Sequence, residues 1–314
     1  MTVRRKEGEA AVVAACRRSM FSELRLSGAA GSRHTLAQEQ DLMAAYDHDS
    51  PRLAAIYDKI SDSQFEGGMR LAERLEIKAG DRVLDVGCGT GRLTSWLAQR
   101  VGAAGAVAGI DPLPERIALA RSRNAELRFA VGGAEDLSAF PDQGFDAVCL
   151  NAVFHWIGDK PRALAEIHRV LRPGGRVGIT TSPKDLYWMA SMPALCASVF
   201  ATSPYLEALE PSALEVMNRH LTTSELLGLL SEQHFVLTEL HVVRRQQRFE
   251  SGEDVVDFAD ASSFGNFLQL VPERLRAALR ADLVAAFDAR KGAEGIQLRS
   301  FGGLLVAKRE TNAS

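Results

Sequence analysis

Residues 83–91, VLDVGCGTG, decide the fold of this chain, because a short apolar run ends abruptly in a loop of three glycines. A buried parallel strand that leads into a tight turn has this pattern. Beyond the loop, apolar residues recur at helical spacing at Leu93, Trp96, Leu97 and Val101. The glycines therefore lie where a strand passes into the N-terminus of a helix, and such a junction can hold a ligand.

The three glycines, Gly87, Gly89 and Gly91, leave the backbone open to a ligand, since they carry no side chain and adopt angles closed to other residues. A phosphate-binding P-loop requires Lys followed by Ser or Thr after the last glycine, but Arg92 stands there. A dinucleotide fingerprint spaces its glycines G-x-G-x-x-G. This loop reads G-x-G-x-G with an acid, Asp85, two residues before the first glycine, which is a more specific arrangement.

Residues 83–91 resemble the first motif of the class I S-adenosylmethionine-dependent methyltransferases, and further motifs of that family follow in order over about residues 52–310. They include residues 151–157, NAVFHWI, and the turn at residues 171–175, LRPGG. The former is similar to a stretch in the carboxyl methyltransferases of trans-aconitate and malonyl thioesters. The resemblance implies a doubly wound α/β fold with a mostly parallel, seven-stranded, Rossmann-like sheet, and S-adenosylmethionine as cofactor.

The pattern of elements predicts four segments. Residues 1–50 are expected to form a helical N-terminal extension, with a flexible tail as the alternative, and residues 51–181 the cofactor-binding core. By resemblance, residues 182–230 form a helical lid insertion, although a plain packing layer is equally compatible with the sequence. Residues 231–314 supply strands and helices that complete the sheet, with helices over 253–290 broken at a glycine and a proline.

Composition narrows the class of protein. The 314 residues are 46% hydrophobic and 25% charged, as in ordinary globular proteins, and the formal charge of −3 gives no electrostatic footprint for nucleic acid. Arg244, Arg245 and Arg248 cluster, but they flank a strand-like run and are expected to form a solvated edge. The sequence carries no prediction of the oligomeric state.

The cysteines, Cys16, Cys88, Cys149 and Cys196, are far apart and show no metal-ligand spacing, so we expect reduced thiols and no metal site. The basic first residues lack the long apolar core of a signal peptide, and no apolar run approaches the length of a membrane span. We therefore expect a cytoplasmic protein that binds neither a membrane nor nucleic acid.

The resemblance places the parts of the cofactor along the strand ends. Asp111 ends a buried strand over residues 106–110, where a carboxylate can accept hydrogen bonds from both ribose hydroxyls; capping the next helix is the alternative. The family usually has an acid at the position of Gly133, so the backbone of Ala134 and the side chain of Glu135 or Asp136 are expected to complete the adenine site. The expected cofactor-binding residues are Tyr57, Gln64, Asp85, Gly87, Cys88, Gly89, Thr90, Gly91, Asp111, Pro112, Ala134, Glu135 and Asn151.

The strand over residues 145–150 should direct the residues after it toward the reacting atoms, because ligands bind at the carboxyl ends of the strands in such sheets. Asn151 and His155 are the predicted catalytic residues, with His155 the only histidine expected there. It can accept a proton from the acceptor. A structural role beside Trp156 is the alternative.

We therefore expect methyl transfer from S-adenosylmethionine to a small molecule, at an oxygen (carboxylate or hydroxyl) of an apolar or amphipathic metabolite. The aromatic and Met-rich composition of residues 182–230 favours such an acceptor. A metalloid methyltransferase of the arsenite type is a second chemistry. A cofactor-binding regulatory module without catalysis is the alternative from another class.

Overall fold

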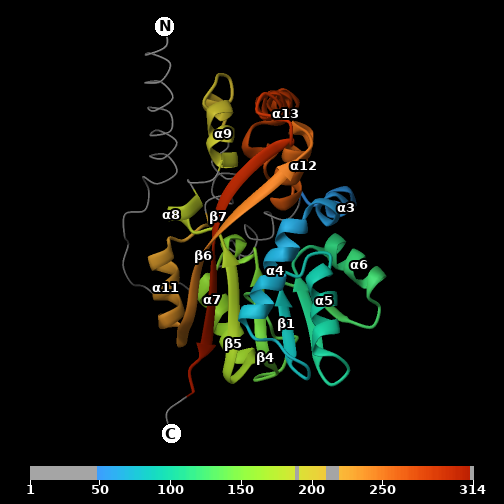
Figure 1. Ribbon diagram of the computed structural model, residues 1–314, viewed down its shortest axis with the longest axis vertical. Helices are drawn as coiled ribbons and strands as arrows, with labels where there is room; N and C mark the ends of the chain where they lie inside the picture. Colours follow the sequence, from blue (N-terminus) through green and yellow to red (C-terminus); the bar gives the residue numbers. More distant parts are fainter. Residues whose placement is uncertain (1–47, 188–190, 210–218, 312–314) are drawn as a thin grey trace. The chain divides into compact units, whose positions relative to one another are not determined.

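The computed structural model describes residues 48–187, 191–209 and 219–311 (Figure 1). Contacts divide the chain into two compact units. We call Asp49–Met189, Arg219–Arg245 and Ser300–Ser314 the sheet unit, since these ranges carry the glycine loop. The described parts of Ala190–Asn218 and Gln246–Arg299 belong to the second unit. The predicted N-terminal extension up to residue 47, and Trp188 of the predicted lid, lie outside the described residues.

One sheet of seven strands runs in the order β3-β2-β1-β4-β5-β7-β6. Strands β1 to β5 pair in parallel, and β7 pairs antiparallel with β5. This confirms the predicted doubly wound, mostly parallel fold. The strands are β1 (Arg82–Val86), β2 (Ala106–Asp111), β3 (Arg128–Val131), β4 (Phe145–Asn151), β5 (Leu171–Thr181), β6 (Phe235–Phe249) and β7 (Ile296–Arg309).

The helices of the sheet unit begin where local sequence supplies a cap. Ser50 accepts a hydrogen bond from Leu53 N at the start of α3, and Thr222 with Glu225 forms a capping box at α11. The elements are α3 (Pro51–Ile60), α4 (Asp62–Arg74), α5 (Arg92–Val101), α6 (Pro114–Arg123), the 3-10 turn η1 (Phe154–Trp156), α7 (Lys160–Val170), α8 (Lys184–Tyr187) and α11 (Thr223–Glu232).

Alternation along the central strands divides the core between the two faces of the sheet. On one face, Val83 of β1 packs with apolar residues of α4 and α5. On the other, Leu84 packs with those of α7 and α11. Asp85 shares the parity of Val83, so its side chain lies on the α4–α5 face, next to the loop.

The second unit contains α9 (Ser191–Phe200), η2 (Leu206–Ala208), α12 (Gly252–Ser262), η3 (Leu268–Leu270) and α13 (Glu273–Asp288). Helix α12 ends and α13 begins on either side of Gly265 and Pro272, as predicted. Phe200 packs edge-on against Phe267, and the Tyr205 hydroxyl donates to Asp282 at 2.6 Å. No helix within the described ranges is both long and apolar enough to cross a membrane.

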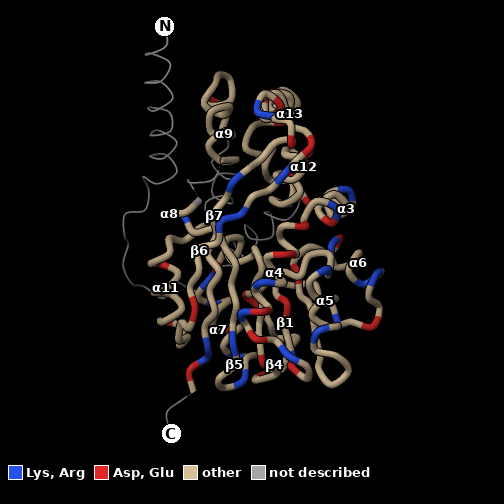
Figure 2. The backbone as a smooth tube through the Cα atoms, viewed as in Figure 1, with Lys and Arg blue, Asp and Glu red and all other residues tan. Residues whose placement is uncertain are grey.

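Strand β6 corrects the expectation of a solvated arginine edge. Figure 2 shows Lys and Arg interspersed with Asp and Glu along the chain. Arg244 and Arg248 are exposed, whereas Arg245 is partly buried and its Nε is shielded from solvent. Because successive side chains of a strand point to opposite faces, Arg245 lies on the covered face of β6 with Val243, which packs against the core.

Candidate functional site

The glycine loop between β1 and α5 requires glycine for two physical reasons. Gly87, Gly89 and Gly91 have φ angles of 72°, 55° and 79°, in the left-handed region that other residues rarely adopt. A Cβ on Gly87 would also overlap the side chain of Val153. The N–H groups of Gly87 and Cys88 donate to Ile110 O at 2.7 and 3.0 Å, which fixes the loop against the end of β2.

Asp111, the last residue of β2, holds both the loop and the start of the next helix. Its Oδ2 accepts from Gly89 N at 2.8 Å and its Oδ1 from Leu113 N at 3.0 Å. The side chain is buried, and this burial raises the pKa of the carboxyl. The two N–H bonds leave further lone pairs on both oxygens.

Asp85 is a buried carboxylate that accepts a hydrogen bond from Thr94. Its Oδ2 accepts from Thr94 Oγ1 at 2.7 Å, and only 1% of the residue is exposed. Burial raises the pKa of Asp85 to about 7 in spite of that hydrogen bond, and the nearby Asp111 adds to the rise. No Lys or Arg in the described chain forms an ion pair with it. Such an acid suits a ligand that brings its own positive charge.

Helices α3 and α4 lie against the glycine loop and are held there by polar contacts. Thr90 Oγ1 donates to Asp58 Oδ1 at 2.7 Å. Arg92, the first residue of α5, donates to Asp58 O at 2.9 Å and to Asp62 Oδ1 at 2.6 Å. The Tyr57 ring lies 3.6 Å from the Cβ position of Gly89. The predicted segment around Tyr57 therefore packs on the loop.

Asn151 joins three elements at the carboxyl edge of the sheet. Its Nδ2 donates to Gln64 O in α4 at 2.8 Å, and its Oδ1 accepts from Thr180 Oγ1 of β5 at 2.7 Å. Gly68 permits this approach, because a Cβ there would lie only 3.0 Å from Asn151 Nδ2. The amide therefore fixes the position of α4 over the end of β4.

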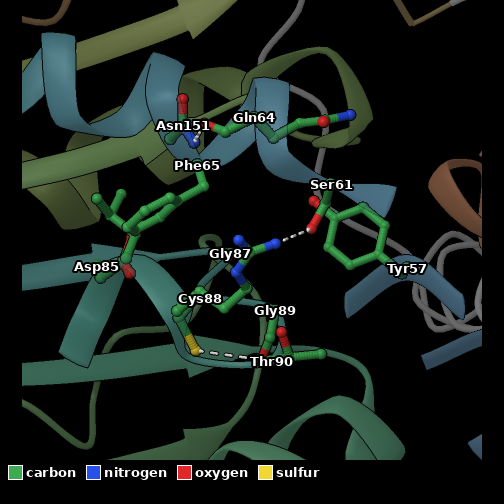
Figure 3. A pocket seen from close by; sticks show the side chains of 12 residues that line it. Tyr57, Ser61, Gln64, Phe65, Asp85, Gly87, Cys88, Gly89, Thr90 and Asn151 are labelled. Atoms are coloured by element: carbon green, nitrogen blue, oxygen red, sulfur yellow. Dashed lines mark hydrogen bonds between the residues drawn. The ribbon is translucent and has the colours of Figure 1, made fainter. Parts of the chain in front are cut away.

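These elements enclose a pocket (Figure 3). In the view, Tyr57 and Ser61 lie across from the glycine loop, and a dashed line marks the bond from Asn151 to Gln64. The lining residues are Tyr57, Ser61, Gln64, Phe65, Asp85, Gly87, Cys88, Gly89, Thr90, Arg92, Leu93 and Asn151. The pocket thus brings together most of the cofactor-binding residues predicted before and at the loop.

Five of the predicted cofactor-binding residues and the predicted catalytic His155 do not line this pocket, and four lining residues were not predicted as site residues. The five are Gly91, Asp111, Pro112, Ala134 and Glu135; the four are Ser61, Phe65, Arg92 and Leu93. Ser61 precedes the predicted Gln64 by three residues and Phe65 by four, and this helical spacing was the signal for two of the missed residues.

The segment expected at the adenine follows β3. Ala134 is buried. Glu135 Oε1 accepts from Gly158 N at 3.1 Å, which ties the segment after β3 to the loop after η1. Asp136 is exposed and its Oδ1 accepts from Ser138 N, a bond that lowers the pKa of Asp136.

His155 lies in η1, just past β4, where the sequence predicts it. Its Nδ1 is 3.3 Å from Thr181 Oγ1. Its ring stacks on His220, a histidine from the segment before α11, with centroids 4.9 Å apart and planes inclined by 13°. Burial, followed by the charge of His220, lowers the pKa of His155 well below its usual value. The imidazole is therefore neutral at pH 7.

The described cysteines do not form a metalloid site. Cys88, Cys149 and Cys196 are buried free thiols. Burial raises the pKa of the first two well above its usual value, and that of Cys196 to about 12. Nor do His, Cys, Asp and Glu side chains in the described ranges form a group that could hold a metal ion.

Comparison with known proteins decides the family. The family described as a methyltransferase domain matches residues 84–179. A 2-phytyl-1,4-beta-naphthoquinone methyltransferase of Arabidopsis thaliana is 32% identical over 206 residues, which cover 59% of this chain and 77% of that protein. The chain belongs to the class I S-adenosylmethionine-dependent methyltransferases.

Other relatives agree over shorter spans. A 2-phytyl-1,4-naphtoquinone methyltransferase of Synechococcus elongatus is 38% identical over 139 residues, 41% of this chain and 59% of that protein. A malonyl-[acyl-carrier protein] O-methyltransferase of Pectobacterium atrosepticum is 35% identical over 130 residues, 41% of this chain and 50% of its own length. The chain thus spans 59% and 50% of these two relatives.

A solved structure shares the fold. The YcgJ protein from Bacillus subtilis superposes with a TM-score of 0.54 at 18% identity, over 79% of this chain and 99% of that one. At this identity the likeness concerns the fold alone.

The cofactor of this methyltransferase family, S-adenosylmethionine, fits the pocket. The ligand carries an ammonium and a sulfonium, and Asp85 is a buried carboxylate without a cationic partner among the described residues. The left-handed loop brings bare backbone to the same wall of the pocket. The charge of the site and the shape of the loop therefore agree with the family.

Proposed function

We propose that this methyltransferase transfers the methyl group of S-adenosylmethionine to a small-molecule acceptor, at a carboxylate or hydroxyl oxygen of an apolar or amphipathic metabolite. The observation that carries the proposal is the Asp85 carboxylate, which is buried beside a loop of left-handed glycines and has no counter-cation among the described residues. The names of the quinone and malonyl-thioester methyltransferases among the relatives support a small-molecule acceptor.

When bound, S-adenosylmethionine supplies an electrophilic methyl group on a sulfonium. The chain therefore mainly has to orient the cofactor and the acceptor and to exclude water from them. We assign Asp85 to the cationic methionine end of the cofactor. Asp111 has lone pairs left for the ribose hydroxyls, and Tyr57 covers the loop from the α3 side. Asn151 keeps α4 in place at the edge of the pocket.

His155 is the proposed general base for the acceptor oxygen. A neutral imidazole can accept a proton, and the low pKa of His155 keeps it neutral. If Nδ1–H donates to Thr181 Oγ1, then Nε2 is the basic nitrogen. A hydroxyl acceptor needs this base, whereas a carboxylate acceptor is already ionised at pH 7.

The buried, protonated thiols do not favour the metalloid alternative, because such chemistry requires accessible thiolates. The regulatory module differs from an enzyme only in turnover. Calorimetry with S-adenosylhomocysteine tests binding, and formation of S-adenosylhomocysteine from S-adenosylmethionine with a pool of hydroxy and carboxylic acids tests turnover. Binding without turnover would favour the regulatory module, and absence of binding would refute the cofactor assignment.

A matched pair of variants tests the base. His155→Gln should lower kcat about 100-fold or more for a hydroxyl acceptor while the affinity for S-adenosylhomocysteine stays unchanged. His234→Gln, at an exposed histidine before β6, is the control and should change neither quantity. Equal loss of thermal stability and of cofactor affinity in His155→Gln would instead assign His155 a packing role.

A further inference from the structure

Arg245 of β6 is partly buried, and its guanidinium has no carboxylate partner among the residues that the structure describes. Its Nε is shielded from solvent and has no hydrogen-bond partner, and no ion pair involves the side chain within the described chain. Burial lowers the pKa of Arg245, and so does the positive charge of Arg70 in α4. Desolvating a charge in this way costs free energy unless an opposite charge offsets it.

Two other arginines of the sheet unit whose side chains are little exposed form ion pairs with carboxylates, and the buried Lys160 donates to Ile157 O at 2.7 Å. Arg116 faces Asp49, with side chains 3% and 4% exposed, and Arg176 faces Asp81 at 3.2 Å. Arg309 also has a buried Nε without a partner, but its Nη1 donates to backbone carbonyl oxygens. The isolation of Arg245 is therefore not a general property of arginines in this fold.

Arg245 lies at the carboxyl end of β5, beside the proposed base. A Cβ on Gly302 would lie 3.0 Å from Thr181 O and 3.1 Å from Arg245 Nη2, so the guanidinium packs close to Thr181. The Oγ1 of Thr181 contacts His155 Nδ1, and Arg245 is among the charges that lower the pKa of His155. All these residues belong to the sheet unit.

A short path of contacts links Arg245 to the cofactor pocket. Asn151 lines the pocket and accepts a hydrogen bond from Thr180, which precedes Thr181 in β5. Thr181 in turn contacts His155 through Oγ1, and its carbonyl oxygen adjoins Gly302, as does Arg245 Nη2. The guanidinium thus occupies the edge of the sheet where an acceptor would meet the cofactor.

The groups around His155 share one sign of charge. Its pKa is lowered by His220, Lys160 and Arg245, and no acid among the described residues opposes them. Lys160 is buried, and burial together with Arg219 lowers its pKa to about 8. The negative charge of Glu135 raises the pKa of Lys160 and so partly offsets this lowering. The side chains at this edge therefore attract an anion.

We propose that Arg245 binds an anionic oxygen group, a carboxylate or a phosphate, carried by the methyl acceptor. The inference rests on the proposed function, and it narrows the acceptor to an acid. A guanidinium presents a planar fork that matches two oxygens of either group. An anion on Arg245 supplies the opposite charge that the described residues do not provide.

Calorimetry on the complex with S-adenosylhomocysteine tests the proposal with three probes of equal chain length: octanoate, octyl phosphate and octanol. Arg245→Gln removes the charge, and Arg244→Gln, at the exposed neighbour on the same strand, is the matched control. We expect at least one anion to bind the wild-type complex more tightly than octanol does. Arg245→Gln should weaken the binding of that anion about 10- to 100-fold and leave the affinity for octanol unchanged. Arg244→Gln should change neither affinity.

The preferred anion distinguishes a carboxylate from a phosphate acceptor. The proposal is overturned if octanol binds as tightly as both anions, if neither anion binds, or if Arg245→Gln and Arg244→Gln behave alike. If Arg245→Gln does not fold, thermal unfolding of the wild-type complex replaces it: the bound anion must raise Tm and octanol must raise it less, or the proposal fails. Binding of S-adenosylhomocysteine is measured first, so its absence would refute the proposed function separately.

Discussion

Replacing Asp85 with Asn tests the electrostatic basis of the site, because the change removes a charge while the side chain keeps its size. The pKa of Asp85 is about 7. Its carboxyl is therefore about one-tenth ionised at pH 6 and about nine-tenths at pH 8. If the cationic end of S-adenosylhomocysteine requires the carboxylate, the affinity of the wild type for this ligand should rise about ninefold between pH 6 and pH 8. This rise corresponds to about 1.3 kcal/mol of binding free energy.

The stability of the unliganded protein should change with pH in the opposite direction to its affinity for the ligand. Folding raises the pKa of Asp85 from 3.8 to about 7, a rise of about 3 units. Its contribution to stability is therefore complete below pH 3.8 and is lost as pH rises to about 7. At about 1.36 kcal/mol per unit, up to about 4 kcal/mol is lost by pH 8. Asp85→Asn avoids this loss, so its advantage in unfolding free energy should grow with pH.

The assay combines calorimetry with S-adenosylhomocysteine at pH 6, 7 and 8 and urea unfolding over the same range. The amine of the ligand titrates as well, but identically with both proteins, so the difference between them isolates Asp85. At pH 8 the variant should bind about 10- to 100-fold more weakly, since a charge-assisted bond contributes about 1.5–3 kcal/mol. Glu126→Gln, at an exposed acid that has no part in the proposed site, is the control. Affinities of wild type and Asp85→Asn with the same pH dependence would refute this assignment.

Three further outcomes follow from the geometry. Gly87→Ala should lower the free energy of unfolding by more than about 2 kcal/mol, about twice the loss in Gly102→Ala. Both glycines have positive φ, but only Gly87 has a side chain packed against its Cβ position, and urea unfolding measures both losses. Asn151→Ala should speed amide exchange in α4 near Gln64, and unchanged exchange would show that the amide does not hold that helix. Because folding lowers the pKa of His155, wild type should lose stability relative to His155→Gln as pH falls below about 6.5, and a constant difference would contradict the buried neutral imidazole.

The cofactor half of the site could be predicted because its causes are local. A strand, a left-handed turn and a helix N-terminus follow one another within residues 83–101, so their spacing in the sequence is their spacing in the fold. The position of Asp111 could be predicted in the same way, because it ends β2, which pairs in parallel with β1. The sequence does not predict the contacts of Arg92 with Asp58 and Asp62, because they depend on how α3 and α4 pack on the loop.

The acceptor half could not be predicted because its members meet only in the tertiary structure. His220 stacks on His155 from a segment before α11, and no spacing links the two. For Arg245 the sequence offered the wrong inference: adjacent arginines favour a solvated edge, but the face of β6 that is covered depends on the core against which Val243 packs. Alternation then exposes Arg244 and buries the side chain of its neighbour.

This division has a consequence for the choice of acceptor. The methyltransferase family matches residues 84–179, which include the glycine loop, Asp111 and His155. His220 and Arg245 lie beyond that range, in the part of the sheet unit that returns to the carboxyl edge of β5. Of the residues proposed to meet the acceptor, His155 therefore lies inside the matched range, whereas His220 and Arg245 lie outside it. Substitution at Arg245 should change which acceptor is methylated and leave the affinity for S-adenosylhomocysteine unaffected, since no contact joins Arg245 to the glycine loop in the described structure.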